Sequence, residues 1–448
     1  MQKKFFLILL IACCFIAGLT KAENLTVQGT LQVETGISLT PFEESEFIKG
    51  ETSLDLIMKH FAGPFRFYAD LLGRYDTVTG EEGSVELKEA SVAADFDKTS
   101  LVAGKIWIAW GRADEVNPVD VINPEDYREP VVAAKEMRKI RIPAFTVSRY
   151  MGNWTVTGVL VPTFTPPALE TSPHWQTAFH ELLGELKDAY LAKAVALSVP
   201  PYALEEYVNE HLSFEDHEAG LSDVQFGGRL NGYLGALDLS LYYYNGYWTD
   251  MSRPVISMRG LDPLFPGLPE KTEILYPRFQ MIGADFAAVL GPYTLRGEGA
   301  WYLGRRITYN THHRDLPRFW EDGGQAQTDV VKFVVGLDRF WGDFYMNIQY
   351  IGEVITDYNS LMMFEEGYLQ SMTAKLSWSL SDGRWEPEVK LLYEETENDL
   401  YVGPRLTHEL YNGIHAYLGA DLFTGNPEGT LGQYRECDRL YTGITYSF

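Results

Sequence analysis

Hydrophobic and polar residues alternate with a period of two through many segments of this chain. Phe344, Met346, Ile348 and Tyr350 occupy every second position, and mostly polar residues fill the positions between them. Because successive side chains of a β-strand point to opposite faces, this pattern predicts strands with one apolar and one polar face. The final segment, 436–448, repeats the pattern and ends on an aromatic residue. The chain is therefore predicted to be all-β.

The connections between these strands alternate in length. Short joints occur at "AGP", "FDKT", "MGN", "LGA", "LGP", "WGD", "SLSDGRW" and "YNG". The long polar connections are 76–82, 108–142, 164–222, 248–276, 305–327, 354–367, 396–401 and 424–435. Strands of about ten residues joined in this way are typical of transmembrane β-barrels.

We predict a closed antiparallel transmembrane β-barrel of about 18 strands, with about 16 as the alternative count. Strand 436–448 should pair with the first strand, 24–36, so that no sheet edge is left open. A loop is expected to join 24–36 to 49–60. Near Glu89 the alternation slips by one residue, which predicts a β-bulge.

The amino terminus carries the features of an export signal. Residues 1–22 begin with Lys3 and Lys4, continue with an apolar run from Phe5 to Leu19, and end with small residues before a cut after Ala22. The run is too short and wrongly flanked to span a membrane as a helix. The sequence predicts a signal peptide over 1–22 and a mature barrel over 23–448 in the bacterial cell outer membrane. A lipoprotein cut before Cys13 is the alternative.

The polar faces of the strands are predicted to line the lumen. The full inward set also includes Asp55, Lys59, Lys105, Asp238, Asp338, Glu388, Glu394 and Asp421 besides the residues named below. Over this set the charges nearly balance in sign, so the net charge of −25 must come mainly from the loops. Acidic outer loops would attract cations to a pore mouth, or would only solvate the surface and bind divalent ions. Opposite charges on neighbouring strands would either pair with one another or tune ion selectivity. The predicted lumen-lining residues are Arg66, Asp70, Arg74, Arg229, Arg296, Glu298, Lys332, Lys375, Lys390, Arg405 and Glu409.

The connection 108–142 is the third long one when the loop between 24–36 and 49–60 is counted, and it has the most informative composition. Two Asn-Pro steps initiate turns, because the residue before proline avoids the helical region and Asn bonds to its own backbone. Acidic residues around these turns precede a basic cluster, which would create a field across a pore or pin the loop by salt bridges. From its place in the strand order, we predict that this loop folds inward and narrows the barrel, as in general diffusion porins. The predicted constriction-loop residues are Trp110, Arg112, Asp114, Glu115, Asn117, Asp120, Asn123, Asp126, Arg128, Lys135, Arg138, Lys139 and Arg141.

A Trp-Gly pair followed by Asn-Pro and Asp turns runs through the same loop. The residues of this motif are Trp110, Gly111, Asp114, Asn117, Pro118, Asp120, Asn123, Pro124 and Asp126. It resembles a poorly characterised family of proteobacterial outer-membrane β-barrels, porin-like proteins with a domain of unknown function. The resemblance is strongest over 99–164. It implies an outer-membrane channel or barrel and defines no substrate.

The longest connection, 164–222, has helical features. Ser172 and Pro173 are a typical helix start, and apolar residues from Trp175 to Tyr190 recur at intervals of three and four. We therefore predict a partly helical outer loop. Its apolar stripe would serve as a lid, as an entry site for hydrophobic solutes, or only as a surface that packs on the barrel rim.

Few residues point to other chemistry. His312 and His313 lie near Asp315, but no further ligand spacing supports a metal site, and no nucleophile-elbow motif occurs. We predict no metal, no cofactor and no catalytic residue. The negative charge balance argues against a nucleic-acid partner.

Together these patterns predict a porin-like channel for passive diffusion of small solutes, narrowed by the inward third loop, and not an enzyme. The alternatives are a ligand-specific uptake or export barrel for hydrophobic or saccharide substrates, or a rim-site membrane enzyme. Outer-membrane lipid and lipopolysaccharide are the expected surroundings. The C-terminal strand and its final Phe448 resemble the signal by which outer-membrane barrels are recognised for assembly, and this resemblance implies the barrel-assembly machinery as a partner. A homo-oligomer is left open.

Overall fold

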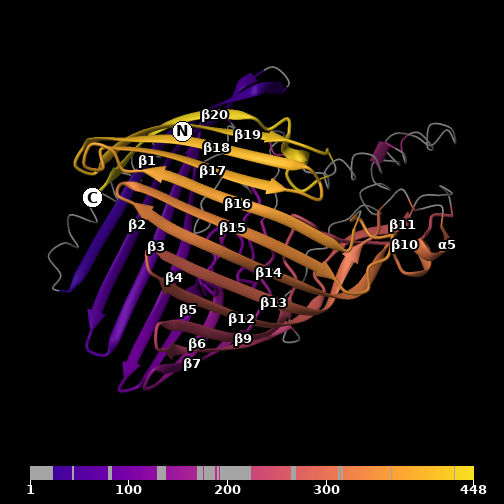
Figure 1. The fold of residues 1–448 in the computed structure, drawn as a ribbon, viewed down its shortest axis with the longest axis horizontal. Coiled ribbons are helices and arrows are strands. Elements are labelled where there is room, and N and C mark those ends of the chain that lie inside the picture. The colour runs from indigo at the N-terminus through magenta and orange to yellow at the C-terminus, as the bar shows by residue number, and fades with distance from the viewer. Residues whose placement is uncertain are drawn as a thin grey trace.

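A computed structural model of the chain shows a closed β-barrel (Figure 1). The residues that it describes are 24–42, 45–78, 83–128, 138–168, 175, 187–188, 191, 223–263, 269–310, 313, 316–364, 366–427 and 429–448. The barrel strands are β1 (Leu25–Phe42), β2 (Ser45–Ala62), β3 (Phe65–Asp76), β4 (Ser84–Phe96), β5 (Thr99–Ile106), β6 (Ile142–Met151), β7 (Trp154–Val161), β8 (Gln225–Leu234), β9 (Leu237–Tyr247), β12 (Arg278–Leu290), β13 (Tyr293–Thr308), β14 (Gln325–Trp341), β15 (Phe344–Ile355), β16 (Tyr368–Trp378), β17 (Trp385–Glu394), β18 (Asp399–Tyr411), β19 (Ile414–Thr424) and β20 (Arg439–Ser447).

The ring closes between the first and the last strand. β1 pairs antiparallel with β2 and with β20, and β9 pairs with β12, which completes an 18-stranded sheet. The predicted closed barrel and its larger strand count are confirmed. Gly29 and Phe448 exchange two backbone hydrogen bonds of 2.9 Å. The Phe448 ring covers Gly29 so closely that a β-carbon there would collide with it.

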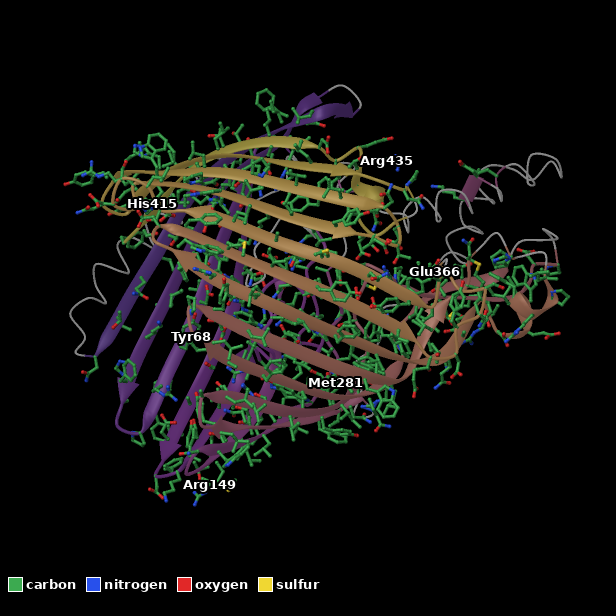
Figure 2. All side chains as sticks on the ribbon, viewed as in Figure 1. Tyr68, Arg149, Met281, Glu366, His415 and Arg435 are labelled. Carbon is green, nitrogen blue, oxygen red and sulfur yellow. The ribbon has the colours of Figure 1, made fainter. Side chains whose placement is uncertain are left out.

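The two ends of the barrel differ. Figure 2 shows Arg149 and His415 at the end where short turns join the strands, and Glu366 and Arg435 at the opposite end. The C-terminus lies with the short turns (Figure 1). This is the arrangement expected when short periplasmic turns alternate with long outer connections.

Apolar side chains cover the outside of the barrel, and polar ones turn inward. On β9, Leu241 is 57% exposed, whereas its neighbours Ser240 and Tyr242 are only 1% and 3% exposed. A water-soluble protein would bury the leucine, so this inverted distribution suits a barrel with lipid outside.

The predicted bulge lies on β4. Asp70 faces Glu89, but the next pair is Leu71 with Leu87, so Lys88 is the extra residue. Lys88 bonds to Asp55 at 2.8 Å. The bulge lets two consecutive charged residues, Lys88 and Glu89, both reach groups inside the barrel.

The first connection departs from the sequence prediction. The loop expected between 24–36 and 49–60 is strand, because pairing of β1 with β2 continues through a register shift at Ile37 as far as Phe42 and Ser45. This part of the prediction was wrong, since backbone pairing persists although the side-chain alternation is weak there.

Three small elements within the long connections were not predicted. The hairpin β10 (Val255–Leu261) and β11 (Pro269–Leu275) and the helix α5 (Pro317–Glu321) lie beyond the end of the barrel opposite the C-terminus (Figure 1). A single 3-10 turn, η4 (Gly432–Tyr434), lies between β19 and β20. Among the described residues, no helix is long and apolar enough to cross a membrane.

The predicted signal peptide over 1–22 and most of the predicted helix after Ser172 lie outside the described residues. Trp175 is described, and it is buried. Its ring lies 6.3 Å from that of Phe423 and 6.1 Å from that of Tyr434, centroid to centroid. This part of the apolar stripe therefore packs at the barrel rim.

Candidate constriction site

The connection between β5 and β6, residues 107–141, is hereafter called the constriction loop. Its described parts, 107–128 and 138–141, fold into the barrel. Its residues contact inward side chains of β9, β12, β13 and β15, and Glu115 reaches Lys390 on β17 at 3.6 Å. In the ring order, β17 lies almost opposite β5 and β6. The loop therefore spans the lumen from one wall to the other.

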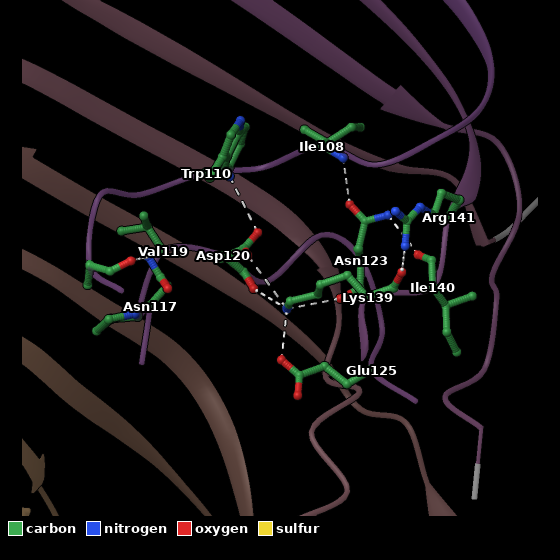
Figure 3. Close-up of polar contacts among 12 residues, drawn as sticks. Ile108, Trp110, Asn117, Val119, Asp120, Asn123, Glu125, Lys139, Ile140 and Arg141 are labelled. Carbon is green, nitrogen blue, oxygen red and sulfur yellow. Dashed lines mark hydrogen bonds and ion pairs between the residues drawn. The ribbon is translucent and has the colours of Figure 1, made fainter. Parts of the chain in front are cut away.

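Asn123 ties the two ends of the constriction loop together (Figure 3). Its Oδ1 accepts a hydrogen bond from the Ile108 N–H at 2.9 Å, and its Nδ2 donates to the carbonyls of Ile106 at 3.1 Å and Ile140 at 2.8 Å. The side chain is only 2% exposed. One amide thus satisfies three backbone groups that would otherwise be buried without partners.

Lys139 joins the acidic turns to the basic cluster (Figure 3). Its Nζ lies 3.0 Å from Glu125 and 3.8 Å from Asp120, and donates to the Asp120 carbonyl at 3.0 Å. Burial lowers the pKa of the Lys139 ammonium, but these carboxylates outweigh burial and raise the pKa above its usual value. Arg141 similarly lies 3.6 Å from Glu89. Lys139 and Arg141 thus pin the loop, as one of the two sequence alternatives proposed.

Of the remaining predicted charges, Asp126 contacts both Arg128 and Arg138. Asp126 accepts a bond from Arg128 Nε at 2.9 Å, and its own N–H donates to the Arg138 carbonyl at 2.6 Å. Lys135 lies outside the described residues. Asp126 and Arg128 thus form an ion pair between residues two positions apart in the chain.

A carboxylate on β13 holds the inner turn of the constriction loop. Glu298 accepts backbone hydrogen bonds from Arg112 at 2.8 Å, Ala113 at 3.2 Å and Val119 at 2.9 Å. Gly111 has a φ of +86°, and a β-carbon there would collide with the same carboxylate. The Trp-Gly step of the sequence motif therefore lets the backbone approach Glu298.

Trp110 and Asn117 shape the loop from within. The Trp110 ring is buried and lies 5.1 Å from the Tyr242 ring, and the backbone N–H of Trp110 donates to Asp120 Oδ1 at 3.4 Å. Asn117 Nδ2 donates to the Ala113 carbonyl at 2.7 Å. Both residues therefore have structural contacts that explain their place in the motif.

Arg112 anchors the loop to β9 and β12. Its guanidinium lies 2.6 Å from Asp238 and donates through Nε to Asp285 at 2.8 Å. Tyr242 donates its hydroxyl to the other oxygen of Asp285. Asp285 and Tyr242 were absent from the predicted site. Asp285 lies at an inward position of β12, between the apolar residues Ala284 and Phe286. This alternation of polar and apolar residues was the sequence signal that could have identified Asp285 as an inward residue.

Asp114 and Glu115 form the inner tip of the loop, and their side chains are 36% and 35% exposed. Asp114 lies 3.5 Å from Arg296 and accepts a bond from Asn347 at 2.7 Å. Burial raises the pKa of Asp114, and Arg296 opposes that rise. The tip therefore presents two carboxylates beside the cations of the wall.

The facing wall carries a group of basic residues on β16, β17 and β18. Lys375 lies directly opposite Lys390, and Glu388 lies directly opposite Arg405. Glu388 compensates part of this charge by pairing with Lys375 at 3.0 Å. The Arg405 guanidinium lies 4.1 Å from the Tyr417 ring centroid. Together with the tip carboxylates, these residues place opposite charges within the same part of the lumen.

The other predicted lumen residues are distributed along the barrel. Lys332 lies 3.3 Å from Glu353, which Arg305 also contacts at 2.7 Å. Arg229 donates to the Ser240 hydroxyl at 3.3 Å. These residues belong to the wall and not to the tip of the constriction loop.

A further group lies outside the constriction region. Asp70 contacts Lys88 at 3.4 Å, and Arg66 pairs with Asp95 at 3.0 Å near the short-turn end. By strand alternation, Arg74 shares the face of Asp70, and Glu409 shares the face of Arg405. Within the described ranges, no three His, Cys, Asp or Glu residues are grouped as metal ligands.

Comparison with known proteins identifies the architecture. No family model and no curated protein matches the chain. Solved structures do match. The fold is that of a porin-like outer-membrane barrel.

OccK8 (OprE) of Pseudomonas aeruginosa aligns with a TM-score of 0.50 and 9% identity, covering 95% of this chain and 98% of that one. OpdL of Pseudomonas aeruginosa gives 0.50 and 9%, with coverage of 95% and 99%. OccAB1 of Acinetobacter baumannii gives 0.50 and 9%, with coverage of 95% and 96%. At this identity the likeness establishes the fold alone.

Proposed function

We propose that this protein is an outer-membrane channel for passive diffusion of small hydrophilic solutes, in which the constriction loop sets the width and charge of the passage. The observation that carries this proposal is the loop itself, held across the lumen from Glu298 on β13 to Lys390 on β17. A loop that only sealed the barrel would gain nothing from exposed charges at its tip, whereas a passage would be tuned by them.

The proposal also covers the proteins to which this chain is related and its surroundings in the membrane. The matched barrels are outer-membrane porins, which supports a channel over a rim-site enzyme. The roles of Gly111 and Asn123 support the inferred relationship to the poorly characterised proteobacterial family, because both motif residues maintain the inward turn. Lipid and lipopolysaccharide would surround the apolar outer face. Recognition of β20 by the assembly machinery and homo-oligomerisation stay predictions.

Single-channel recording in a planar bilayer tests the channel proposal. The wild type should give stable conductance, and a variant with residues 113–117 replaced by a Gly-Ser linker should conduct more. Replacement of the short turn 381–383 by the same kind of linker is the matched control and should leave conductance unchanged. Silence of correctly folded wild type and loop variant would contradict the proposal.

A further inference from the structure

A cavity of about 290 Å³ lies on the long-connection side of the constriction loop. Pro118 of the loop lines one side of it, and Thr430 and Tyr434 of the connection between β19 and β20 line another. Trp248 and Glu394 belong to its walls. A solute that entered from this end would pass through the cavity, which Glu115 of the loop tip also lines.

The basic residues around the cavity are already engaged. Arg138 has interactions of its own. The other pairs, with their N–O distances, are Lys139 with Glu125 at 3.0 Å, Arg305 with Glu353 at 2.7 Å, Lys332 with Glu353 at 3.3 Å and Arg253 with Glu397 at 3.6 Å. An entering anion would therefore have to compete with carboxylates that are fixed in the protein.

Glu394 differs from the other carboxylates of the cavity. It is the last residue of β17 and lies opposite Ser371 on β16 and Asp399 on β18, at an inward position. Within the part of the chain that the structure describes, its carboxylate has neither a hydrogen bond nor an ion pair. Among the described residues, Asp250, also in the wall, accepts bonds only from the neutral groups of Tyr127 and Ser252.

Asp250 and Glu394 are therefore the lining carboxylates without an ion pair among the described residues, and aromatic rings line the same cavity. Tyr302, Tyr434 and Trp248 all belong to the wall. The guanidinium of Arg305 already lies over one of these rings, 4.1 Å from the centroid of Trp248. Carboxylates and aromatic faces together recognise organic cations. No grouping of three carboxylates favours a divalent metal among the described residues.

We propose that this cavity binds small organic cations, namely primary amines or guanidinium compounds, with Glu394 as the anionic contact. The inference deepens the proposed channel function, on which it rests, by naming the solute class held before the constriction. Lys332 and Arg253 are the nearest cations facing Glu394, and Glu353 and Glu397 neutralise them in part.

Calorimetric titration of the detergent-solubilised full chain tests the inference without requiring conductance. Benzylammonium, benzoate and benzyl alcohol are matched probes with one ring and a positive, negative or neutral group. We expect benzylammonium to bind roughly tenfold tighter than benzyl alcohol, and benzoate to bind weakest, because one close charge pair in partly screened surroundings is worth about that factor. Glu394→Gln should abolish the preference, and Glu366→Gln, an exposed outer-end control, should retain it.

A second variant keeps the test valid if Glu394→Gln fails to fold. Lys332→Gln removes a repelling cation near Glu394 and should strengthen benzylammonium binding, while Arg305 continues to pair with Glu353. Equal binding of all three probes, or tighter binding of benzoate, would overturn the inference. Cation binding by a barrel that does not conduct would refute the channel proposal and support the cavity site. Conductance without a preference for cations would support the channel proposal and refute the cavity site.

Discussion

Replacement of Glu298 by glutamine should release the constriction loop while leaving the barrel intact. The carboxylate uses both oxygens: Oε2 accepts from Arg112 and Ala113, and Oε1 accepts from Val119. A glutamine keeps the size of the side chain but offers one acceptor oxygen and one donor nitrogen. Whichever way the amide turns, at least one loop N–H then faces another donor.

The size of the effect follows from these contacts. A hydrogen bond to a charged group contributes about 1.5–3 kcal/mol, and a buried donor left without an acceptor costs about 1–3 kcal/mol. Loss of one such bond and weakening of the other two should therefore cost about 3 kcal/mol. This corresponds to a roughly hundredfold rise in the ratio of detached to attached loop. Because the backbone pairing of β13 does not involve the side chain, barrel stability should barely change.

Single-channel current noise is the appropriate assay. The wild type should show a quiet open level, whereas Glu298→Gln should show frequent excursions to a higher conductance as the loop detaches. Heat-modifiable migration on a gel checks that the variant is folded. Glu386→Gln, an exposed position on β17, provides the isosteric control. Identical noise and conductance in Glu298→Gln and wild type would refute the idea that this carboxylate holds the loop.

Three further outcomes are expected. Gly29→Val should collide with the Phe448 ring and lower the yield of heat-modifiable barrel, whereas Gly158→Val, where a β-carbon meets open space, should not. Burial raises the pKa of Asp114, so acidification should neutralise this carboxylate at a higher pH than an ordinary aspartate. Cation selectivity, measured as the reversal potential in a salt gradient, should fall as Asp114 is neutralised. Asp114→Asn should remove this pH dependence. Asn123→Ala leaves three buried backbone groups unpaired and should speed limited proteolysis of the constriction loop by more than tenfold.

Much of the fold could be predicted because a strand has a period of two and a lipid-facing barrel must display it outward. The strand around Ile348 alternates cleanly, and the slip near Glu89 correctly located the bulge. The hairpin β10–β11 was missed because it lies within a polar connection, where neither face is lipid-exposed. Such elements are decided by contacts with other connections, which sequence periodicity does not contain.

The site was harder to predict than the fold. The inward loop could be expected from its place in the strand order, but its partners come from β9 to β17, more than a hundred residues further along the chain. Whether Lys139 would face a passage or pair with Asp120 and Glu125 depended on the three-dimensional turn geometry. Asp285 was likewise unrecognisable as an anchor until Arg112 was placed beside it.

Two buried carboxylates on strands hold the connections that enclose the space on the long-connection side of the constriction loop. Both do so by accepting hydrogen bonds from backbone N–H groups. Glu298 binds the N–H groups of the constriction loop, and Asp399 accepts backbone bonds from Asn426 at 2.7 Å and from Leu431 and Gly432 at 2.9 Å, which fixes the connection between β19 and β20. Both carboxylates are buried and face backbone, so they set shape and not selectivity. The exposed charges of the tip and the wall make few such bonds. Their substitution can therefore change which solutes pass without altering the frame that holds the passage open.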